Sequence, residues 1–271
     1  MILDNLVVDD SMAKPKIGLS MLYCLSNPFK EMAKQIPKFR VQYIELVDDG
    51  WHTLSSQRVS KLNRIRKEHD VKYSVHAPFS DVNIASPSKP LLKAMIRRLE
   101  QSMDHAVALD AYMWVFHPGI RTGISMFYPN EDWRQNLESV RLLGMMAREK
   151  GLRIALENVP EPFPFLMKSV EDFEKFYSEV KFEVGMALDV GHAHIRGEVQ
   201  DFLKAFPKKI VHMHLSDNVG DSDRHLGLGF GTVNWNDFAN SIRNMDYDGA
   251  LIVESVEQVE ECLSKLGSMF S

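Results

Sequence analysis

The sequence predicts one α/β domain in which eight parallel strands and their connecting helices close into a (β/α)₈ barrel. Short apolar runs alternate with amphipathic stretches along the 271 residues, at intervals of about 25 to 45 residues. Each connection between parallel strands needs a crossover of a dozen or more residues, which the amphipathic stretches supply. Eight such units close a TIM barrel, a fold that usually takes about 250 residues.

The predicted strands are nearly continuous in Val, Ile, Leu, Phe and Met, as expected for parallel strands buried on both faces. They cover Ile17–Leu22, Val41–Val47, Val71–His76, Met113–His117, Leu152–Glu157, Val184–Asp189, Ile210–Leu215 and Ala250–Glu254. A doubly wound open sheet is the main alternative. Its glycine-rich phosphate loop is not found, because the Gly-x-Gly-x-Gly run Gly227–Gly231 follows only the seventh strand. The barrel is therefore the prediction.

Helices are predicted between the strands from three–four spacing of apolar residues. The stretch Lys89–Leu109 shows it, with Ser88 as a candidate N-cap and Pro90 in the first turn. Trp133–Lys150 repeats the pattern and stops at Gly151, where a helix-ending glycine belongs. Shorter helices are predicted at Ser55–His69, Ser169–Ser178, Asp201–Phe206, Asn236–Asn244 and Val256–Leu266.

The composition excludes several classes of protein. A net charge of −5, from 32 basic and 37 acidic residues, argues against a generally cationic nucleic-acid binder but leaves room for a local basic groove. No apolar run approaches the roughly 18 residues of a membrane span. Two cysteines, Cys24 and Cys262, cannot form a disulfide framework. We expect a soluble, cytoplasmic protein with an N-terminal extension at 1–15 and the barrel at 16–271.

Metal-binding side chains occupy six of the eight strand ends or the loops just after them. They are His76, His117, Glu157, Asp189, His192, His214, Asp223, His225 and Glu254. In a barrel all these positions face one mouth, and an isolated buried carboxylate needs a partner. A single histidine here would more often be structural, but nine such groups at one rim predict cations. Imidazole and carboxylate without thiolate suit Zn²⁺ or Mn²⁺, with Co²⁺, Fe²⁺ and Mg²⁺ as further possibilities.

Four of the nine, Glu157, Asp189, His214 and Glu254, come from consecutive strands and could enclose one cation. Other residues near the mouth carry weaker predictions. Glu45 is expected to hydrogen-bond a ligand histidine or a substrate hydroxyl, with a plain structural role as the alternative. His212 should support the site from deeper in the barrel, because it lies two residues before His214, and His194 should lie in a loop or on the rim. Cys24 alone is weak evidence for a nucleophile.

The motifs VFHPG, IALENVP, ALDVGHAH, HMHLSDN and DRHLGLGFGTVNW occur in this order, within residues 16 to 267. In this respect the chain resembles the xylose isomerase-like TIM-barrel superfamily, which includes endonuclease IV and many sugar or sugar-phosphate isomerases and epimerases. The endonuclease IV pattern implies three metal ions on all nine residues. The isomerase pattern implies one ion on Glu157, Asp189, His214 and Glu254. It also implies that Glu157 and Glu254 exchange a proton with the sugar, while His192 and Arg224 bind its oxygens.

The complete ligand set favours an endonuclease IV-like hydrolase acting on abasic DNA, whereas departures from that family favour the isomerase. The loop ENVPEPFPFLMKS is rich in proline and phenylalanine where endonuclease IV proteins have glycine and glutamine, and Gly191 replaces a frequent cysteine. The loop Tyr23–Phe29 lacks a polar, glycine-containing stretch. Small sugar sites prefer aromatic walls, which could come from Phe79, Phe163, Phe165, Phe230 and Trp235.

We therefore predict a metal-dependent isomerase or epimerase of a sugar or sugar phosphate, with one to three ions and a possible homodimer. The nuclease is the alternative. A third hypothesis, a barrel that binds without catalysis, predicts a broken ligand set, and none of the expected ligands is missing.

Overall fold

The computed structural model describes residues 14–271, in which eight parallel strands form a closed barrel in the order β1 to β8. Each strand pairs with the next one along the chain, and β8 pairs with β1. The strands are β1 Lys16–Ser20, β2 Tyr43–Val47, β3 Lys72–His76, β4 Met113–Phe116, β5 Ile154–Glu157, β6 Gly185–Asp189, β7 Ile210–Leu215 and β8 Ala250–Val253. The predicted single-domain (β/α)₈ fold is confirmed.

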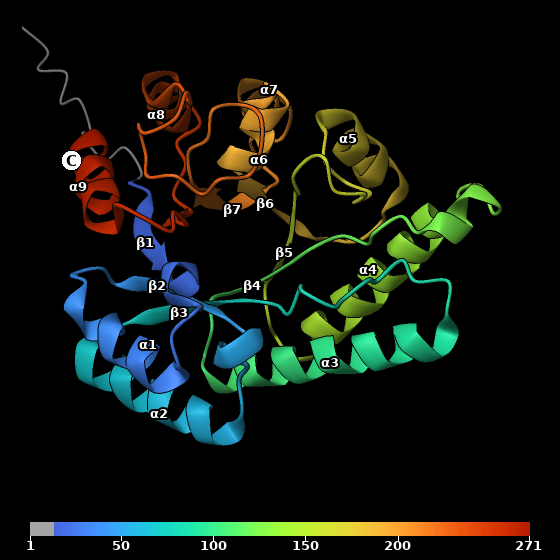
Figure 1. The fold of residues 1–271 in the computed structure, drawn as a ribbon, viewed down its shortest axis with the longest axis horizontal. Coiled ribbons are helices and arrows are strands. Elements are labelled where there is room, and N and C mark those ends of the chain that lie inside the picture. The colour runs from blue at the N-terminus through green and yellow to red at the C-terminus, as the bar shows by residue number, and fades with distance from the viewer. Residues whose placement is uncertain (1–13) are drawn as a thin grey trace, which may run out of the picture.

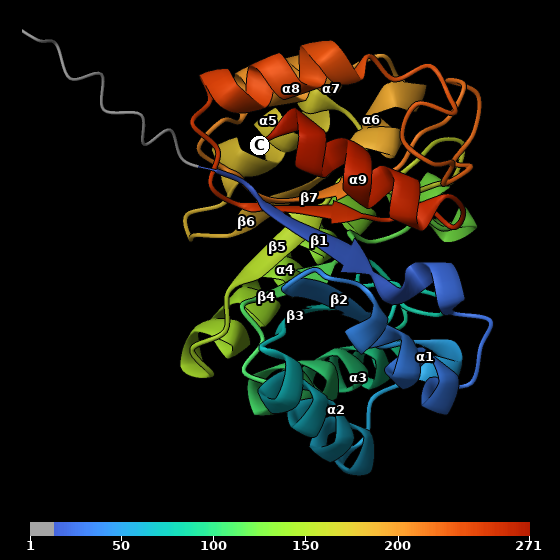
Figure 2. The same cartoon turned by 90° about the vertical axis from the view of Figure 1, so that its left-hand side faces the viewer.

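Nine α-helices occur in the described part of the chain, and they surround the barrel (Figures 1 and 2). They are α1 Phe29–Gln35, α2 Ser56–His69, α3 Lys89–Ala108, α4 Glu131–Glu149, α5 Val170–Glu179, α6 Val190–Ile195, α7 Val199–Ala205, α8 Trp235–Asn244 and α9 Val259–Met269. In Figure 2, α1 to α3 lie below the strands and α6 to α9 above them.

Local sequence signals account for most of these helix boundaries. The Ser169 hydroxyl accepts a hydrogen bond from the amide of Asp172, whose carboxylate bonds back to Ser169, forming a capping box for α5. Gly151 follows α4 with φ +66°, the left-handed conformation that favours glycine. The prediction missed the short helices α1 and α6, which have seven and six residues.

The first strand is shorter than predicted. It ends at Ser20 rather than Leu22, because Met21–Cys24 forms a 3₁₀ turn. The hydroxyl of Ser20 accepts a hydrogen bond from the amide of Leu22 and so caps that turn. The predicted extension at 1–15 falls almost entirely on residues 1–13, outside the described residues.

Alternation along the strands separates two cores. Trp114 and Phe116 of β4 point outward and belong to the large core beneath the helices, whereas Met113 and Val115 point into the barrel. The inner apolar cluster also contains Ala155, so small and medium side chains fill the barrel axis. No helix among residues 14–271 is long and apolar enough to cross a membrane.

Candidate metal centre

The period of two along a strand explains why distant ligands converge. Each inward side chain is followed two residues later by another inward side chain, at the carboxyl end of the same strand. Ala155 is thus followed by Glu157, Ala187 by Asp189, His212 by His214 and Ile252 by Glu254. The last inward position of these strands carries a metal-binding group, so the strands deliver their ligands to one mouth.

The central group consists of Glu157, Asp189, His214 and Glu254, each with one ligand atom within 4.8 Å of the others. His214 Nδ1 lies 2.8 Å from Glu157 Oε1 and 3.3 Å from Glu254 Oε2. Asp189 Oδ2 is buried and has no hydrogen-bond partner among the described residues. An unpartnered buried carboxylate oxygen is costly, so the atoms of this group fit a cation.

A second group shares Glu157 and adds His76 and His117. Both imidazole Nε2 atoms lie 3.2 Å from Glu157 Oε2. The Nδ1 of His76 is 2.8 Å from the carbonyl oxygen of Ala77, which makes Nδ1 the proton-bearing nitrogen and directs Nε2 at the carboxylate. Glu157 therefore faces the central group with one oxygen and the second group with the other.

A third group consists of His192, Asp223 and His225, in α6 and the loop between β7 and α8. Asp223 Oδ2 lies 3.2 Å from His192 Nε2 and 3.1 Å from His225 Nε2. The other ring nitrogen of each histidine faces a backbone carbonyl, at Asn158 for His192 and at Glu254 for His225. With Nδ1 donating to these carbonyls, both Nε2 atoms face the carboxylate, and either a proton or a cation must lie between them.

In the absence of a cation, protons balance the charge of these groups. Burial lowers the pKa of His76, but the hydrogen bond to Glu157 and nearby acids outweigh this effect and raise it to about 9. Burial likewise lowers the pKa of His192, yet Asp189 and Asp223 raise it to about 10. Burial raises the pKa of Glu254 to about 7, despite the opposing charge of His214. A bound cation would replace these protons.

Beneath the central group, the carboxylate of Glu45 lies between His212 and His214 of β7. Its side chain is fully buried, with Oε1 2.8 Å from His214 Nε2 and Oε2 2.9 Å from His212 Nε2. Ser74 donates a hydrogen bond of 3.0 Å to the same Oε2. A carboxylate behind a ligand histidine fixes the ring and raises its basicity. Glu45 thus hydrogen-bonds His212 and lies close to His214, a predicted ligand, and its contact with substrate stays a prediction.

Of the five aromatic residues predicted to line the mouth, two lie beside His117 and one is buried elsewhere. Phe163 and Phe230 are exposed, and their role as wall residues stays a prediction. Phe79 and Phe165 do border the site, with ring centroids 5.5 and 5.7 Å from that of His117. Trp235 is wrong as a wall residue, because it is buried in α8 and its ring N–H donates to Asp217. His194 lies in α6 rather than in a loop, and its Nε2 is 2.8 Å from the hydroxyl of Thr232.

Cations in the loops after β4 to β7 are paired with acids of the same chain. Arg121 pairs with Asp132 and Lys168 pairs with Glu161, at 2.9 and 2.7 Å. Arg196 also pairs with Glu161, and Arg224 pairs with Asp221. The guanidinium of Arg224, predicted to bind substrate, is therefore held by a neighbouring carboxylate in this structure.

Two buried polar residues that position the site are absent from the sequence prediction. Asn158 donates to the carbonyl of Asp189, accepts from its amide and presents its own carbonyl to His192. Asp217 accepts hydrogen bonds from the amides of Gly229 and Val233, which ties down the loop that carries the third group. In the sequence, Asn158 directly follows the predicted ligand Glu157, and Asp217 comes shortly after the predicted ligand His214. This proximity was the signal by which the two residues could have been found.

With this geometry described, comparisons with known proteins place the chain in a family. A profile described as xylose isomerase-like TIM barrel matches residues 38–265. This chain belongs to that family.

Several relatives are similar along most of the barrel. The uncharacterised protein MJ1311 of Methanocaldococcus jannaschii is 28% identical over 89% of this chain and 83% of its own length. A probable endonuclease 4 of Aquifex aeolicus is 23% identical over 78% of this chain and 80% of its own length. A solved D-tagatose 3-epimerase-like protein superposes with a TM-score of 0.87 at 26% identity, covering 94% of this chain and 98% of that one.

Proposed function

We propose that this chain is a divalent-metal-dependent epimerase or isomerase of a small sugar or sugar derivative. The observation that carries the proposal is the central group, in which Glu157 at the end of β5 and Glu254 directly after β8 lie together with Asp189 and His214. A cation there, Zn²⁺ or Mn²⁺ by ligand type, would polarise the carbonyl and adjacent hydroxyl of a bound ketose. Similarity to an epimerase-like structure supports the same reaction class.

The two glutamates would carry the proton in this reaction. One carboxylate removes the proton from the carbon next to the carbonyl, and the other returns a proton to the opposite face of that carbon for epimerisation. Delivery to the adjacent carbon instead gives isomerisation. Glu157 and Glu254 come from strands three positions apart in the barrel, so they approach the mouth from different sides. His192 and Arg224 remain the proposed contacts to the sugar oxygens.

The surroundings of the mouth favour a small, weakly charged substrate. The four loop cations are neutralised by Asp132, Glu161 and Asp221, so they offer little unpaired charge to a polyanion. Nucleic-acid affinity depends on neutralising several phosphates. Phe79 and Phe165 offer apolar surfaces against which a sugar ring can pack.

Exchange of carbon-bound protons with solvent tests this function, and it can be followed for several sugars in parallel. The Mn²⁺-loaded protein is incubated in D₂O with a panel of ketoses, and NMR follows deuterium entry at the carbons beside the carbonyl. We expect exchange in at least one ketose and a loss of about 100-fold or more in Glu157→Gln and Glu254→Gln. His194→Gln, at the rim, is the matched control and should retain exchange. Unchanged exchange in either glutamate variant would contradict the paired-carboxylate mechanism.

A multinuclear phosphodiesterase is the second candidate, because the second and third groups are also complete. An enzyme that uses one cation has no need for His117 and His225 as ligands, whereas a metal cluster that generates hydroxide and neutralises a phosphodiester needs them. Similarity to endonuclease 4 supports abasic DNA as the substrate in that case.

Substitutions in these outer groups separate the two candidates. His117→Ala and His225→Ala should reduce, but not abolish, sugar exchange under the first function, and should abolish cleavage of an abasic-site duplex under the second. If the wild-type protein cleaves the abasic-site duplex and both variants do not, the phosphodiesterase function would replace the epimerase proposal. A cytoplasmic location and a homodimer remain predictions, and gel filtration with light scattering tests the dimer.

A further inference from the structure

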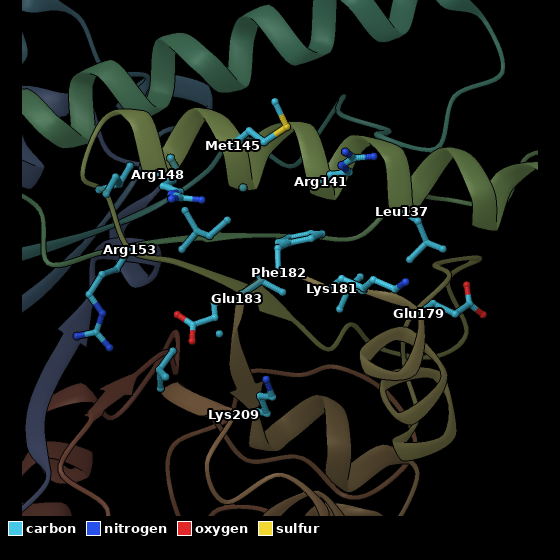
Figure 3. A pocket seen from close by; sticks show the side chains of 18 of the residues that line it. Leu137, Arg141, Met145, Arg148, Arg153, Glu179, Lys181, Phe182, Glu183 and Lys209 are labelled. Atoms are coloured by element: carbon cyan, nitrogen blue, oxygen red, sulfur yellow. The ribbon is translucent and has the colours of Figure 1, made fainter.

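A basic groove lies at the end of the barrel opposite the candidate metal centre. Its floor includes Met113, Ile154 and Gly185, the first residues of β4, β5 and β6, whereas the candidate metal-binding residues stand at or just after the last residues of these strands. One wall is α4, and the other is the segment between α5 and β6 (Figure 3). The groove has a volume of about 1300 Å³.

The charge of this groove is opposite to that of the chain. Seven basic and three acidic side chains line it, in a protein whose net charge is −5. Arg134 is paired with Glu131 and Glu138. Among the residues described, no ion pair involves the other six cations of the groove. Lys209 lies over the ring of Tyr177. The remaining five are exposed: Arg141, Arg148, Arg153, Lys181 and Lys208. The groove therefore offers unneutralised positive charge to a ligand.

The cations follow the long axis of α4. Arg141 and Arg148 are seven residues apart, so they project from the same side of the helix about 10.5 Å apart along its axis. Figure 3 shows Arg148 and Arg153 towards one end of the groove and Arg141 and Lys181 towards the other. A row of this kind matches an extended polyanion better than a single compact anion.

An aromatic ring lies between these cations. Phe182 is half-buried and packs against α4 at Gly144, where an added Cβ would come within 3.0 Å of the ring. Figure 3 shows the ring inside the groove, between α4 and the strands. Aromatic rings within a cationic groove are the usual platform for stacking the bases of a single strand.

We propose that this groove binds single-stranded nucleic acid. The arginines and lysines contact successive phosphates, and the ring of Phe182 stacks against a base. A second copy of the chain is a poorer occupant, since a two-fold contact would bring the same cations together. An acidic peptide would use the charge of the groove but has no bases to stack on the ring of Phe182.

Fluorescence anisotropy with a fluorescein-labelled dT₁₂ strand tests the proposal at 50 and 200 mM NaCl, with and without EDTA. We expect binding that is unaffected by EDTA, and a weakening of at least 10-fold in Arg141→Glu/Arg148→Glu. The salt slope should fall by about 1.4, as for two lost phosphate contacts on a single strand. The matched control is Arg64→Glu/Arg97→Glu, which makes the same charge change at exposed positions of α2 and α3 and should bind within 2-fold of wild type.

Phe182→Leu keeps the apolar packing but removes the aromatic face, and should weaken dT₁₂ about 3-fold or more. No binding at 50 mM NaCl, equal losses in the two double variants, or binding that EDTA abolishes would overturn the proposal. Competition by inorganic polyphosphate or poly-L-glutamate as effective as unlabelled dT₁₂, with no effect of Phe182→Leu, would overturn the assignment to nucleic acid. Circular dichroism of each variant confirms that the fold is kept.

Discussion

At the carboxyl ends of the strands, acids and histidines are buried and face one another, whereas at the amino ends arginines and lysines face water. Glu45, Glu157 and His214 are almost completely buried, and His214 lies 2.8 Å from each of the two carboxylates. Arg141 and Arg153 are exposed and have no ion pair in the described chain. Buried charge must be compensated inside the protein, but exposed charge is compensated by solvent.

This difference indicates at which end of the barrel a change of charge affects the stability of the fold. At the mouth, removing a proton or cation leaves opposing carboxylates in a site of low dielectric, so occupancy and stability are coupled. At the opposite end, charge can be changed with little effect on the fold. The two ends should therefore respond to the same kinds of substitution by very different amounts.

The largest expected effect is that of cation removal on stability. A ligand that binds only the folded chain stabilises it by about 4 kcal/mol at a thousand times its dissociation constant. We expect protein stripped with EDTA to unfold at clearly lower temperature and urea concentration than protein with Mn²⁺ or Zn²⁺, and Mg²⁺ to have a weaker effect. Differential scanning calorimetry measures the change. Identical unfolding curves with and without cations would show that stability does not depend on a cation at the mouth, and would contradict the expected difference between the two ends of the barrel.

Glu45→Gln should weaken cation binding without changing a proposed ligand. The amide keeps the shape but loses the charge behind His214, and loss of such a supporting partner reduces metal affinity about 10- to 100-fold. Isothermal titration calorimetry of the metal-free proteins measures this affinity. Glu183→Gln, the same change in the basic groove, is the control and should leave affinity unaltered. An equal affinity in Glu45→Gln and wild type would show that Glu45 is only structural.

The stability of the metal-free protein should fall between about pH 6.5 and pH 9. Burial lowers the pKa of His225, but Asp223 and nearby acids raise it to about 9, and the pKa of His76 is raised to the same value. A raised histidine pKa stabilises the folded state below the unfolded value, near 6.5, and this contribution is lost as the pH rises through 9. Urea titrations in EDTA at pH 6, 7.5 and 9 measure the trend. Stability that rises over this range would contradict the histidine–carboxylate contacts.

The smallest effect is expected from charge reversal in the basic groove. Arg148→Glu changes the net charge but disrupts no ion pair, so the free energy of unfolding should change by less than about 0.5 kcal/mol. Urea denaturation provides the value. A loss of several kcal/mol would show that Arg148 has an intramolecular partner in solution.

Most of the fold and the membership of the central group were predictable from the sequence. The predicted ligands stand at the last inward position of buried strands, where the period of two and the closure of the barrel fix their direction. This is why Glu157, Asp189, His214 and Glu254 could be grouped although 97 residues separate the first from the last.

What could not be predicted depends on contacts outside the strand period. Trp235 reads as an aromatic wall in the sequence, yet its helix places it in the core against Asp217. The ion pair between Arg224 and Asp221 forms within one irregular loop, whose path follows no periodic pattern. The basic groove joins α4 to residues some 40 positions further along the chain, and only the packing of the outer helices brings them together.

The most direct test of the account is the number of cations that this chain binds. Protein purified without chelator, and metal-free protein titrated with Mn²⁺ or Zn²⁺, are analysed by inductively coupled plasma mass spectrometry and calorimetry. We predict between one and three ions per chain, and fewer in Glu157→Gln, because Glu157 belongs to two of the ligand groups. No bound metal and no heat of binding, in a chain that is folded by circular dichroism, would contradict the central claim.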